Sequence, residues 1–215
     1  MSMILYGYFR SSAAYRMRIA LNLKRLDYEQ RSIHLRNGEQ RADDFLTLQP
    51  QGLVPVLQDG DAALIQSPAM LEYLDEAYPD SAPLLPSAPV DRARVRAISD
   101  IVCCDIHPLG NLRVLQFLQG PLGIDQAAMI DWFNHWIRLG FDAIETLLAD
   151  DPRTGRFCHG DHPGMADVCL VPQVFNSRRH DLDLTPYPTI SRIWQACEAE
   201  AAFAEAHPSR QPDAE

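Results

Sequence analysis

Polar residues of types that bind and activate small anionic molecules stand near the beginning of the sequence. Arg10, Ser11 and Ser12 lie between a short apolar run and an amphipathic stretch, so we expect them where a strand passes into a helix. The free N–H groups and the dipole of a helix N-terminus favour an anion there. A serine hydroxyl at this point can donate a hydrogen bond to a thiolate and so lower the pKa of the thiol. The alternative interpretation is that Ser11 and Ser12 only cap the helix.

Two further segments have residues suited to a ligand. Pro55 lies near the start of an apolar run and cannot donate to a sheet ladder, which predicts a turn or an edge strand. Gln66 and Ser67 precede Pro68 at a second junction from strand to helix, where they could hold a carboxylate. The alternative for this pair is a helix cap, and for Pro55 it is an ordinary edge-strand proline.

The elements that must position these residues follow an alternating pattern. The periodicity predicts the order β-α-β-(α)-β-β-α, with strands at 3–8, 28–35, 53–58 and 62–65 and helices at 15–24 and 67–78. Asp59-Gly60 indicates a hairpin, which makes the last two strands antiparallel. The first two strands are joined through a helix and should be parallel.

A proline-rich stretch divides the chain. Pro79, Pro83, Pro86 and Pro89 follow one another closely, and we place a domain boundary there. The pattern beyond is helical, with a bend expected near Pro108. The expected helical stretches are 91–118, 127–148, 164–179 and 188–206. The sequence therefore predicts an α/β domain at residues 1–83 and an all-α domain at 90–215.

The composition disfavours several classes of function. The 215 residues carry a formal net charge of −10, which disfavours nucleic acid because an acidic surface repels phosphate. No apolar run approaches the roughly 20 residues that span a bilayer, and we see no secretory signal. The five cysteines include no CxxC pair, and no histidine pair has metal-ligand spacing. We expect a cytoplasmic protein with no metal and no membrane or nucleic-acid partner.

Taken together, the three segments stand in the order of a glutathione site, and the sequence around them resembles the zeta class of glutathione transferases. The matching segments are YFRSSAAYRMRIAL at 8–21, QPQGLVP at 49–55, IQSPA at 65–69, CDIHPLGN at 104–111 and DLTPYP at 183–188. They extend over nearly the whole chain. The class includes bacterial maleylpyruvate and maleylacetoacetate isomerases. The resemblance implies the glutathione transferase fold, in which a thioredoxin-like α/β N-terminal domain precedes an all-α C-terminal domain.

The resemblance also implies roles for individual residues. Ser11 would activate the sulfur of glutathione, with Ser12 as a neighbouring donor and Arg10 beside them in catalysis. In thioredoxin-like domains the proline at the position of Pro55 is cis, which leaves the backbone of Val54 free to pair with glutathione. Further contacts to glutathione are implied for Gln40, Gln51, Gln66, Ser67 and His107. Gln40 departs from the basic or imidazole side chain that relatives often carry.

Another departure lies at the start of a second-domain helix. Relatives usually carry Ser or Thr at the position of Gly164. Glycine is a tolerable cap, and Asp167 keeps its half of the capping box, so we expect this helix to form.

The implied activity is the cis–trans isomerisation of a maleyl dicarboxylic keto acid, with glutathione as the cofactor. The thiol adds to the double bond, rotation follows, and the thiol leaves. A substrate with two carboxylates needs cationic donors, and the candidates are Arg10, Arg113, Arg178 and Arg179. For each arginine the alternative is a solvated surface residue.

Several alternatives stay open at this point. The keto-acid tail distinguishes maleylpyruvate from maleylacetoacetate, and a few pocket side chains would select between them. The same scaffold also serves conjugating transferases and dehalogenases of small haloacids. A binding protein without activity is a third hypothesis, which an intact Ser11 disfavours because pure binding needs no thiol-activating residue. The resemblance further implies a homodimer.

Overall fold

The computed structural model describes residues 3–215; Met1 and Ser2, which belong to the predicted first domain, lie outside the described residues. The chain divides into two compact units. The first unit combines the sequence up to Leu84 with Glu198–Glu215, and the second is Leu85–Cys197. Within residues 3–215, every helix is too short or too polar to cross a membrane.

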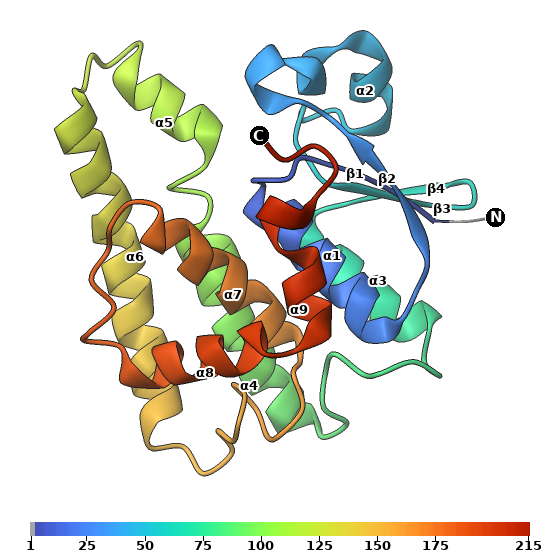
Figure 1. Ribbon diagram of the computed structural model, residues 1–215, viewed down its shortest axis with the longest axis vertical. Helices are drawn as coiled ribbons and strands as arrows, with labels where there is room; N and C mark the ends of the chain where they lie inside the picture. The colour runs from blue at the N-terminus through green and yellow to red at the C-terminus, as the bar shows by residue number, and fades with distance from the viewer. Residues whose placement is uncertain (1–2) are drawn as a thin grey trace. The chain divides into compact units, whose positions relative to one another are not determined.

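A four-stranded sheet forms the centre of the first unit (Figure 1). Its strands are β1 (Met3–Gly7), β2 (Tyr28–Ser32), β3 (Val56–Asp59) and β4 (Ala62–Ile65), in the spatial order β2-β1-β3-β4. The strands β1 and β2 are parallel because a helix connects them, whereas β3 and β4 form an antiparallel hairpin. The predicted strands and both of their pairings are confirmed.

Helices cover both faces of this sheet. Figure 1 shows α1 (Ser12–Lys24) and α3 (Ser67–Ala77) on one face and α2 (Asp43–Leu48) on the other. Two 3-10 turns, η1 (Leu35–Asn37) and η2 (Glu39–Arg41), lead into α2. The helix α1 is buried on almost every side, which makes it the core of the unit.

The first unit also takes up the end of the sequence, which corrects the predicted boundary. The helix α9 (Ala201–Ala206) and the turn η4 (Pro208–Arg210) follow the second unit in the chain. However, α9 packs on α1, where the Arg18 side chain donates to the carbonyl oxygen of Ala206 at 3.0 Å. The sequence prediction placed residues 198–215 in the all-α domain. Periodicity indicates a helix but not the core that its apolar face meets.

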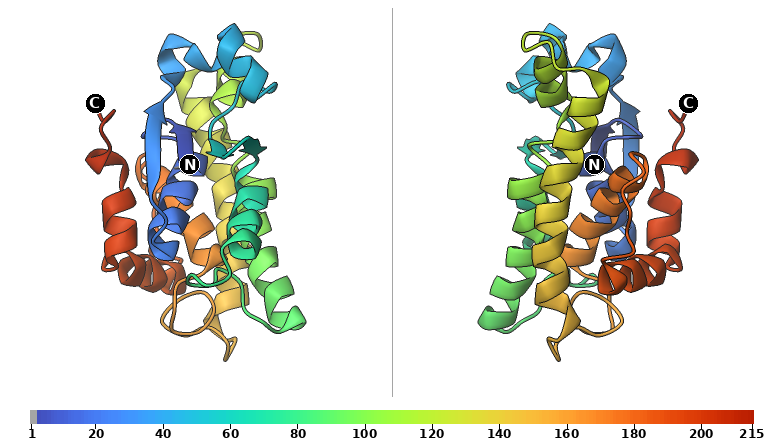
Figure 2. Two further views of the ribbon diagram at one scale, coloured as in Figure 1. Left: turned by 90° about the vertical axis from the view of Figure 1, so that its right-hand side faces the viewer. Right: turned by 90° about the vertical axis from the view of Figure 1, so that its left-hand side faces the viewer.

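The second unit is all-helical, as predicted. Its helices are α4 (Pro89–Asp100), α5 (Leu112–Gln119), α6 (Gln126–Ala149), α7 (Met165–Arg178) and α8 (Pro188–Glu198). Figure 2 shows α6 running the length of this unit. After α4 the backbone continues as one π-helical segment, η3 (Ile101–Ile106), and regular helix resumes only at α5. The single bent stretch predicted at 91–118 is therefore interrupted at the place where the bend near Pro108 was expected.

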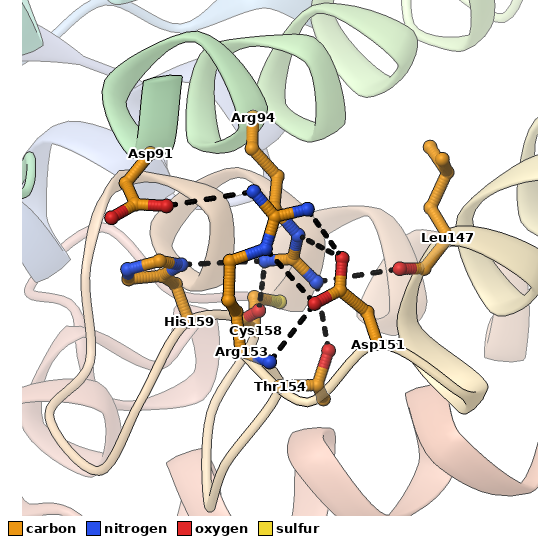
Figure 3. Close-up of polar contacts among 8 residues, drawn as sticks. All are labelled: Asp91, Arg94, Leu147, Asp151, Arg153, Thr154, Cys158 and His159. Atoms are coloured by element: carbon orange, nitrogen blue, oxygen red, sulfur yellow. Dashed lines mark hydrogen bonds and ion pairs between the residues drawn. The ribbon is translucent and has the colours of Figure 1, made fainter. Parts of the chain in front are cut away.

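Arg94 ties the loop after α6 to α4 (Figure 3). Its guanidinium donates to Asp151 Oδ2 at 3.0 Å and to Thr154 Oγ1 at 2.8 Å. It also donates to the carbonyl oxygens of Cys158 at 2.7 Å and Leu147 at 3.3 Å. The Arg94 side chain is only 9% exposed. One buried side chain therefore fixes the loop that leads into α7.

Replacing Arg94 by methionine should lower the free energy of unfolding by about 2–4 kcal/mol, because four acceptors around the loop then lose a charged donor. Methionine keeps most of the apolar volume, so lost packing contributes little. Urea denaturation measures the change. The matched control is Arg153→Met, which removes a 41% exposed partner of the same Asp151 and should shift the midpoint far less. Equal shifts for the two variants would contradict this account of the loop.

Candidate functional site

The register of the sheet brings the three predicted segments, around Ser11, Pro55 and Gln66, to one end of its strands. Tyr6 of β1 pairs with Val56 of β3, and Val56 pairs with Ile65 of β4. The turn after β1, the residues before β3 and the turn after β4 therefore lie at the same end of the sheet. The structure thus places together the first-unit segments that the sequence had only put in order.

Ser11 is the N-cap of α1. Its Oγ accepts a hydrogen bond from the Ala14 N–H at 3.2 Å, and its own N–H donates to the Tyr8 carbonyl oxygen at 2.9 Å. Capping uses the hydroxyl only as an acceptor, so its hydrogen remains available to donate. The two interpretations of Ser11 are therefore compatible, because one hydroxyl can cap the helix and stabilise a thiolate.

The neighbours of Ser11 leave the helix end positive. Ser12 is the first residue of α1 and is buried, while Arg10 is half-buried with its guanidinium 5.8 Å from the Phe9 ring. The first turn of α1 contains no acidic residue that would offset the dipole. An anion near Ser11 therefore meets a partial positive charge from the helix and a full charge on Arg10.

The Val54–Pro55 peptide bond is cis, as predicted. Pro55 is buried, and Val54 is half-buried immediately before β3. The pairing of the Val54 backbone with a ligand stays a prediction.

The turn after β4 holds Gln66 in an unusual conformation. Its φ of 68° lies in the left-handed region, which costs a residue with a side chain about 1–3 kcal/mol and is typical of functional sites. The Gln66 side chain does not cap α3; instead its Nε2 donates to Gln51 Oε1 at 2.9 Å. The cap interpretation is therefore wrong for the Gln66 side chain, and the two predicted ligand-binding glutamines lie together.

Arg16 is a candidate site residue that sequence reasoning missed. It is buried inside α1, and its Nη1 donates to Ser67 Oγ at 3.2 Å. Among the described residues, its Nε and Nη2 find no hydrogen-bond partner. A buried guanidinium with unused donors leaves positive charge uncompensated beside the N-terminus of α3, which itself has no acidic residue in its first turn. The signal in the sequence was a charged arginine within a helix whose other residues predict burial in the core.

Tyr8 also lies at this turn. Burial raises the pKa of its phenol above the ordinary value of 10.0, so it stays neutral near pH 7. In residues 3–215 its hydroxyl has no hydrogen-bond partner. The neutral Tyr8 hydroxyl, two residues before Arg10, is therefore able to donate a hydrogen bond to a ligand.

Gln40 is tied into the loop that surrounds it. Its side chain is buried and its Nε2 donates to the Leu35 carbonyl oxygen at 3.4 Å. The Gln40 backbone also packs against Gly52, where an added Cβ would lie 3.0 Å from the Gln40 oxygen. Gly52 also has a φ of +62°, so both the close approach of the Gln40 oxygen and the backbone conformation favour glycine here. The expected contact between Gln40 and glutathione stays a prediction.

Four of the predicted site residues belong to the second unit. His107 follows η3 and is half-buried, and Arg113 is exposed in the first turn of α5. Arg178 and Arg179 are exposed at the end of α7, and the Arg178 guanidinium lies 4.4 Å from the ring centre of Trp194. Their roles toward cofactor and substrate stay predictions. Within residues 3–215, no group of His, Cys, Asp or Glu side chains is arranged to hold a metal ion.

Comparison with known proteins identifies the family. Residues 1–76 match the model of the glutathione S-transferase N-terminal domain, and residues 137–208 match that of the C-terminal domain. A maleylpyruvate isomerase of Ralstonia sp is 50% identical over 211 residues, which are 98% of this chain and 99% of that protein.

Two solved structures extend the likeness to three dimensions. The holo structure of a bacterial zeta-class maleylpyruvate isomerase is 49% identical, with a TM-score of 0.96 over 99% of this chain and 100% of that one. A maleylacetoacetate isomerase from Anaeromyxobacter dehalogenans, with bound dicarboxyethyl glutathione and citrate, is 43% identical, with a TM-score of 0.88 over 100% of this chain and 94% of that one. This chain belongs to the glutathione S-transferase family, in the zeta-class branch of the maleylpyruvate and maleylacetoacetate isomerases.

Proposed function

We propose that this protein is a glutathione-dependent cis–trans isomerase that converts a maleyl dicarboxylic keto acid, maleylpyruvate or maleylacetoacetate, to its fumaryl isomer. The observation that carries the proposal is the Ser11 hydroxyl, which caps α1 through its oxygen and keeps its hydrogen for a thiolate. Relatives that match this chain over 94% or more of their length bear the names of both isomerases.

The residues at this end of the sheet fit a peptide that carries one thiol and two carboxylates. Ser11 and the N-terminus of α1 suit the thiolate. Ser67, at the N-terminus of α3, suits a carboxylate, and a carboxylate there would offset the unused positive charge of Arg16. The Val54 backbone and the Gln51–Gln66 pair would bind the peptide groups between these ends.

When bound, glutathione supplies a thiol that adds reversibly to the substrate double bond and so permits rotation about it. The chain keeps that thiol ionised near neutral pH, because the Ser11 hydrogen bond and the positive end of α1 both favour the thiolate. They lower its pKa from the ordinary thiol value of about 8.5. Arg10, adjacent to Ser11, stabilises negative charge that develops on the substrate.

The second unit supplies the remaining cations for a substrate with two carboxylates. Arg113, Arg178 and Arg179 are proposed to hold these groups through paired hydrogen bonds. The indole of Trp194 restricts the orientation of the Arg178 guanidinium, which favours Arg178 over Arg179 for such a fixed geometry. The two-carboxylate glutathione derivative bound by the Anaeromyxobacter relative supports a dianionic substrate.

A homodimer in the cytoplasm completes the proposal. Within residues 3–215, none of the five cysteines forms a disulfide, which suits a reducing compartment. Light scattering of the purified protein should give twice the 24.2 kDa mass of the chain.

Turnover of maleylpyruvate and maleylacetoacetate, each generated enzymatically and followed by loss of absorbance, tests the activity. We expect turnover only with glutathione, and faster for one of the two substrates. S-methylglutathione is the matched control, because it keeps the peptide and blocks the thiol; it should compete with glutathione without supporting turnover. Glutathione binding without turnover of either acid would sink the isomerase and favour a conjugating transferase or a haloacid dehalogenase.

A further inference from the structure

The segment of residues 207–215 returns to the turn that carries Ser11. Figure 1 shows the chain after α9 running alongside the β1–α1 connection. The Asp213 carboxylate accepts a hydrogen bond from the Phe9 N–H at 3.0 Å and one from Gln30 Nε2 at 3.3 Å. Phe9 stands 204 residues before Asp213, so this contact depends entirely on the tertiary fold.

Glu215 adds a second attachment of the same segment. Its carboxylate contacts His34 Nε2, and it accepts a hydrogen bond from Arg36 Nη1 at 3.1 Å. These partners follow β2, just as Gln30 lies within it. The 207–215 segment therefore bridges the end of β1 and the end of β2.

Both backbone polar groups of Phe9 are hydrogen-bonded to side chains from other parts of the first unit. The Phe9 N–H meets Asp213, and the Phe9 carbonyl oxygen accepts from Arg18 Nη2 at 3.0 Å. The same Arg18 donates through Nε to the Ala206 carbonyl oxygen at 3.0 Å. Phe9 and Arg18 are almost fully buried, and the Asp213 carboxylate that reaches the Phe9 N–H is half-buried. The backbone is thus fixed two residues before Ser11.

The charge of Asp213 has the wrong sign for a direct role in thiol activation. A carboxylate near a thiolate disfavours ionisation of the thiol. Asp213 must therefore act through geometry, since a carboxylate is a strong acceptor for a backbone N–H. Small displacements of a catalytic group are costly, with about 100-fold lost for a 1 Å misplacement.

We propose that Asp213 is a positioning residue: by holding the Phe9 amide it fixes where Ser11 presents its hydroxyl to the glutathione sulfur. This inference rests on the proposed glutathione-dependent function. It assigns the 207–215 segment to the catalytic turn, although that segment lies outside the matched signature residues of the glutathione site.

The test compares Asp213→Ala with Asp213→Asn. Alanine removes the side-chain acceptor of the Phe9 N–H. We expect the pKa of the bound glutathione thiol to rise by about one to two units, which is the value of one hydrogen bond from Ser11 to the charged thiolate. The ultraviolet absorbance of the thiolate follows this pKa. Turnover should fall about 10- to 100-fold. Asparagine keeps an acceptor oxygen but no charge, so Asp213→Asn should retain a thiol pKa and turnover close to those of the wild type.

Equal losses in both variants would overturn the proposal, because they would trace the effect to charge. An unchanged thiol pKa in Asp213→Ala would overturn it as well. Glu205→Ala, an exposed substitution on α9, is the control and should behave as wild type. Because the thiol titration needs glutathione but no substrate, it reports on Asp213 even if neither maleyl acid turns over.

Hydrogen exchange of the unmodified protein guards against a variant that fails to fold. The Phe9 amide should exchange as slowly as the amides in the core of β1, because the Asp213 carboxylate must move away before the amide can exchange with water. Fast exchange at Phe9 beside a protected β1 would also overturn the proposal.

Discussion

Ser11→Ala should lower the glutathione-dependent turnover of the maleyl acid about 100- to 1,000-fold, the usual effect of removing one preorganised donor to a developing or full negative charge. Alanine removes the whole hydroxyl: the oxygen that accepts from the Ala14 N–H as the helix cap, and the hydrogen that the cap does not use. The loss should appear in kcat, together with a raised pKa of the bound thiol, whereas affinity for glutathione should change little. Steady-state kinetics and thiolate absorbance measure these quantities separately.

Ser11→Asp separates the chemistry from the cap. Aspartate caps a helix as well as serine does, so thermal stability should be kept, while alanine costs roughly 1 kcal/mol. However, aspartate offers no donor and repels a thiolate, so its activity should be no higher than that of Ser11→Ala. An active Ser11→Asp enzyme would mean that Ser11 acts only as a cap. Ser12→Ala, made alone and together with Ser11→Ala, tests whether Ser12 substitutes as a donor.

Asp167→Ala should be the most destabilising single substitution predicted for this chain, with about 3–5 kcal/mol lost from the free energy of unfolding. The Asp167 carboxylate is buried and accepts from the Cys158 N–H and the Gly164 N–H, both at 2.9 Å. Burial raises the pKa of this carboxyl, and the two amide donors oppose the rise. Alanine would leave the buried Cys158 N–H and the half-buried Gly164 N–H without this acceptor. Denaturant unfolding followed by circular dichroism measures the loss.

Asp161→Ala is the matched control for this measurement. Asp161 also accepts from a backbone amide, that of Arg156 at 3.0 Å, but it is exposed, and water can replace it. Asp167→Asn should fall between the two, because its amide keeps one acceptor and turns a donor toward the other N–H group. A stability of Asp167→Ala close to that of Asp161→Ala would show that the burial of Asp167 is unimportant.

Local patterns predicted most of the elements. The hairpin at Asp59-Gly60, the break near Pro108 and the start of α3 all follow from the backbone preferences of glycine and proline. Asp167 kept its half of the capping box opposite Gly164, as expected. One expected helix at 188–206 proved to be α8 and α9, separated by two residues that no strong breaker marks.

Contacts between distant parts of the chain could not be predicted in this way. The resemblance named Ser11 and the Gln66–Ser67 pair, but nothing local indicates that Arg16 reaches Ser67 or that Asp213 reaches Phe9. Both contacts cross long stretches of sequence. The backbone strain at Gln66 was equally hidden, because a glutamine is not a residue type that signals a left-handed conformation.

The return of the chain to its first unit has a consequence for synthesis on the ribosome. Residues up to Leu84 emerge early, yet α9 and the residues around Asp213 emerge only after the whole second unit, Leu85–Cys197, has been made. At about 5–20 residues per second, that leaves a delay of roughly 10 s. During this interval the apolar side of α1 waits for α9, and the turn bearing Ser11 waits for its last attachment. A nascent chain therefore acquires its sheet well before it acquires a competent thiol-activating turn.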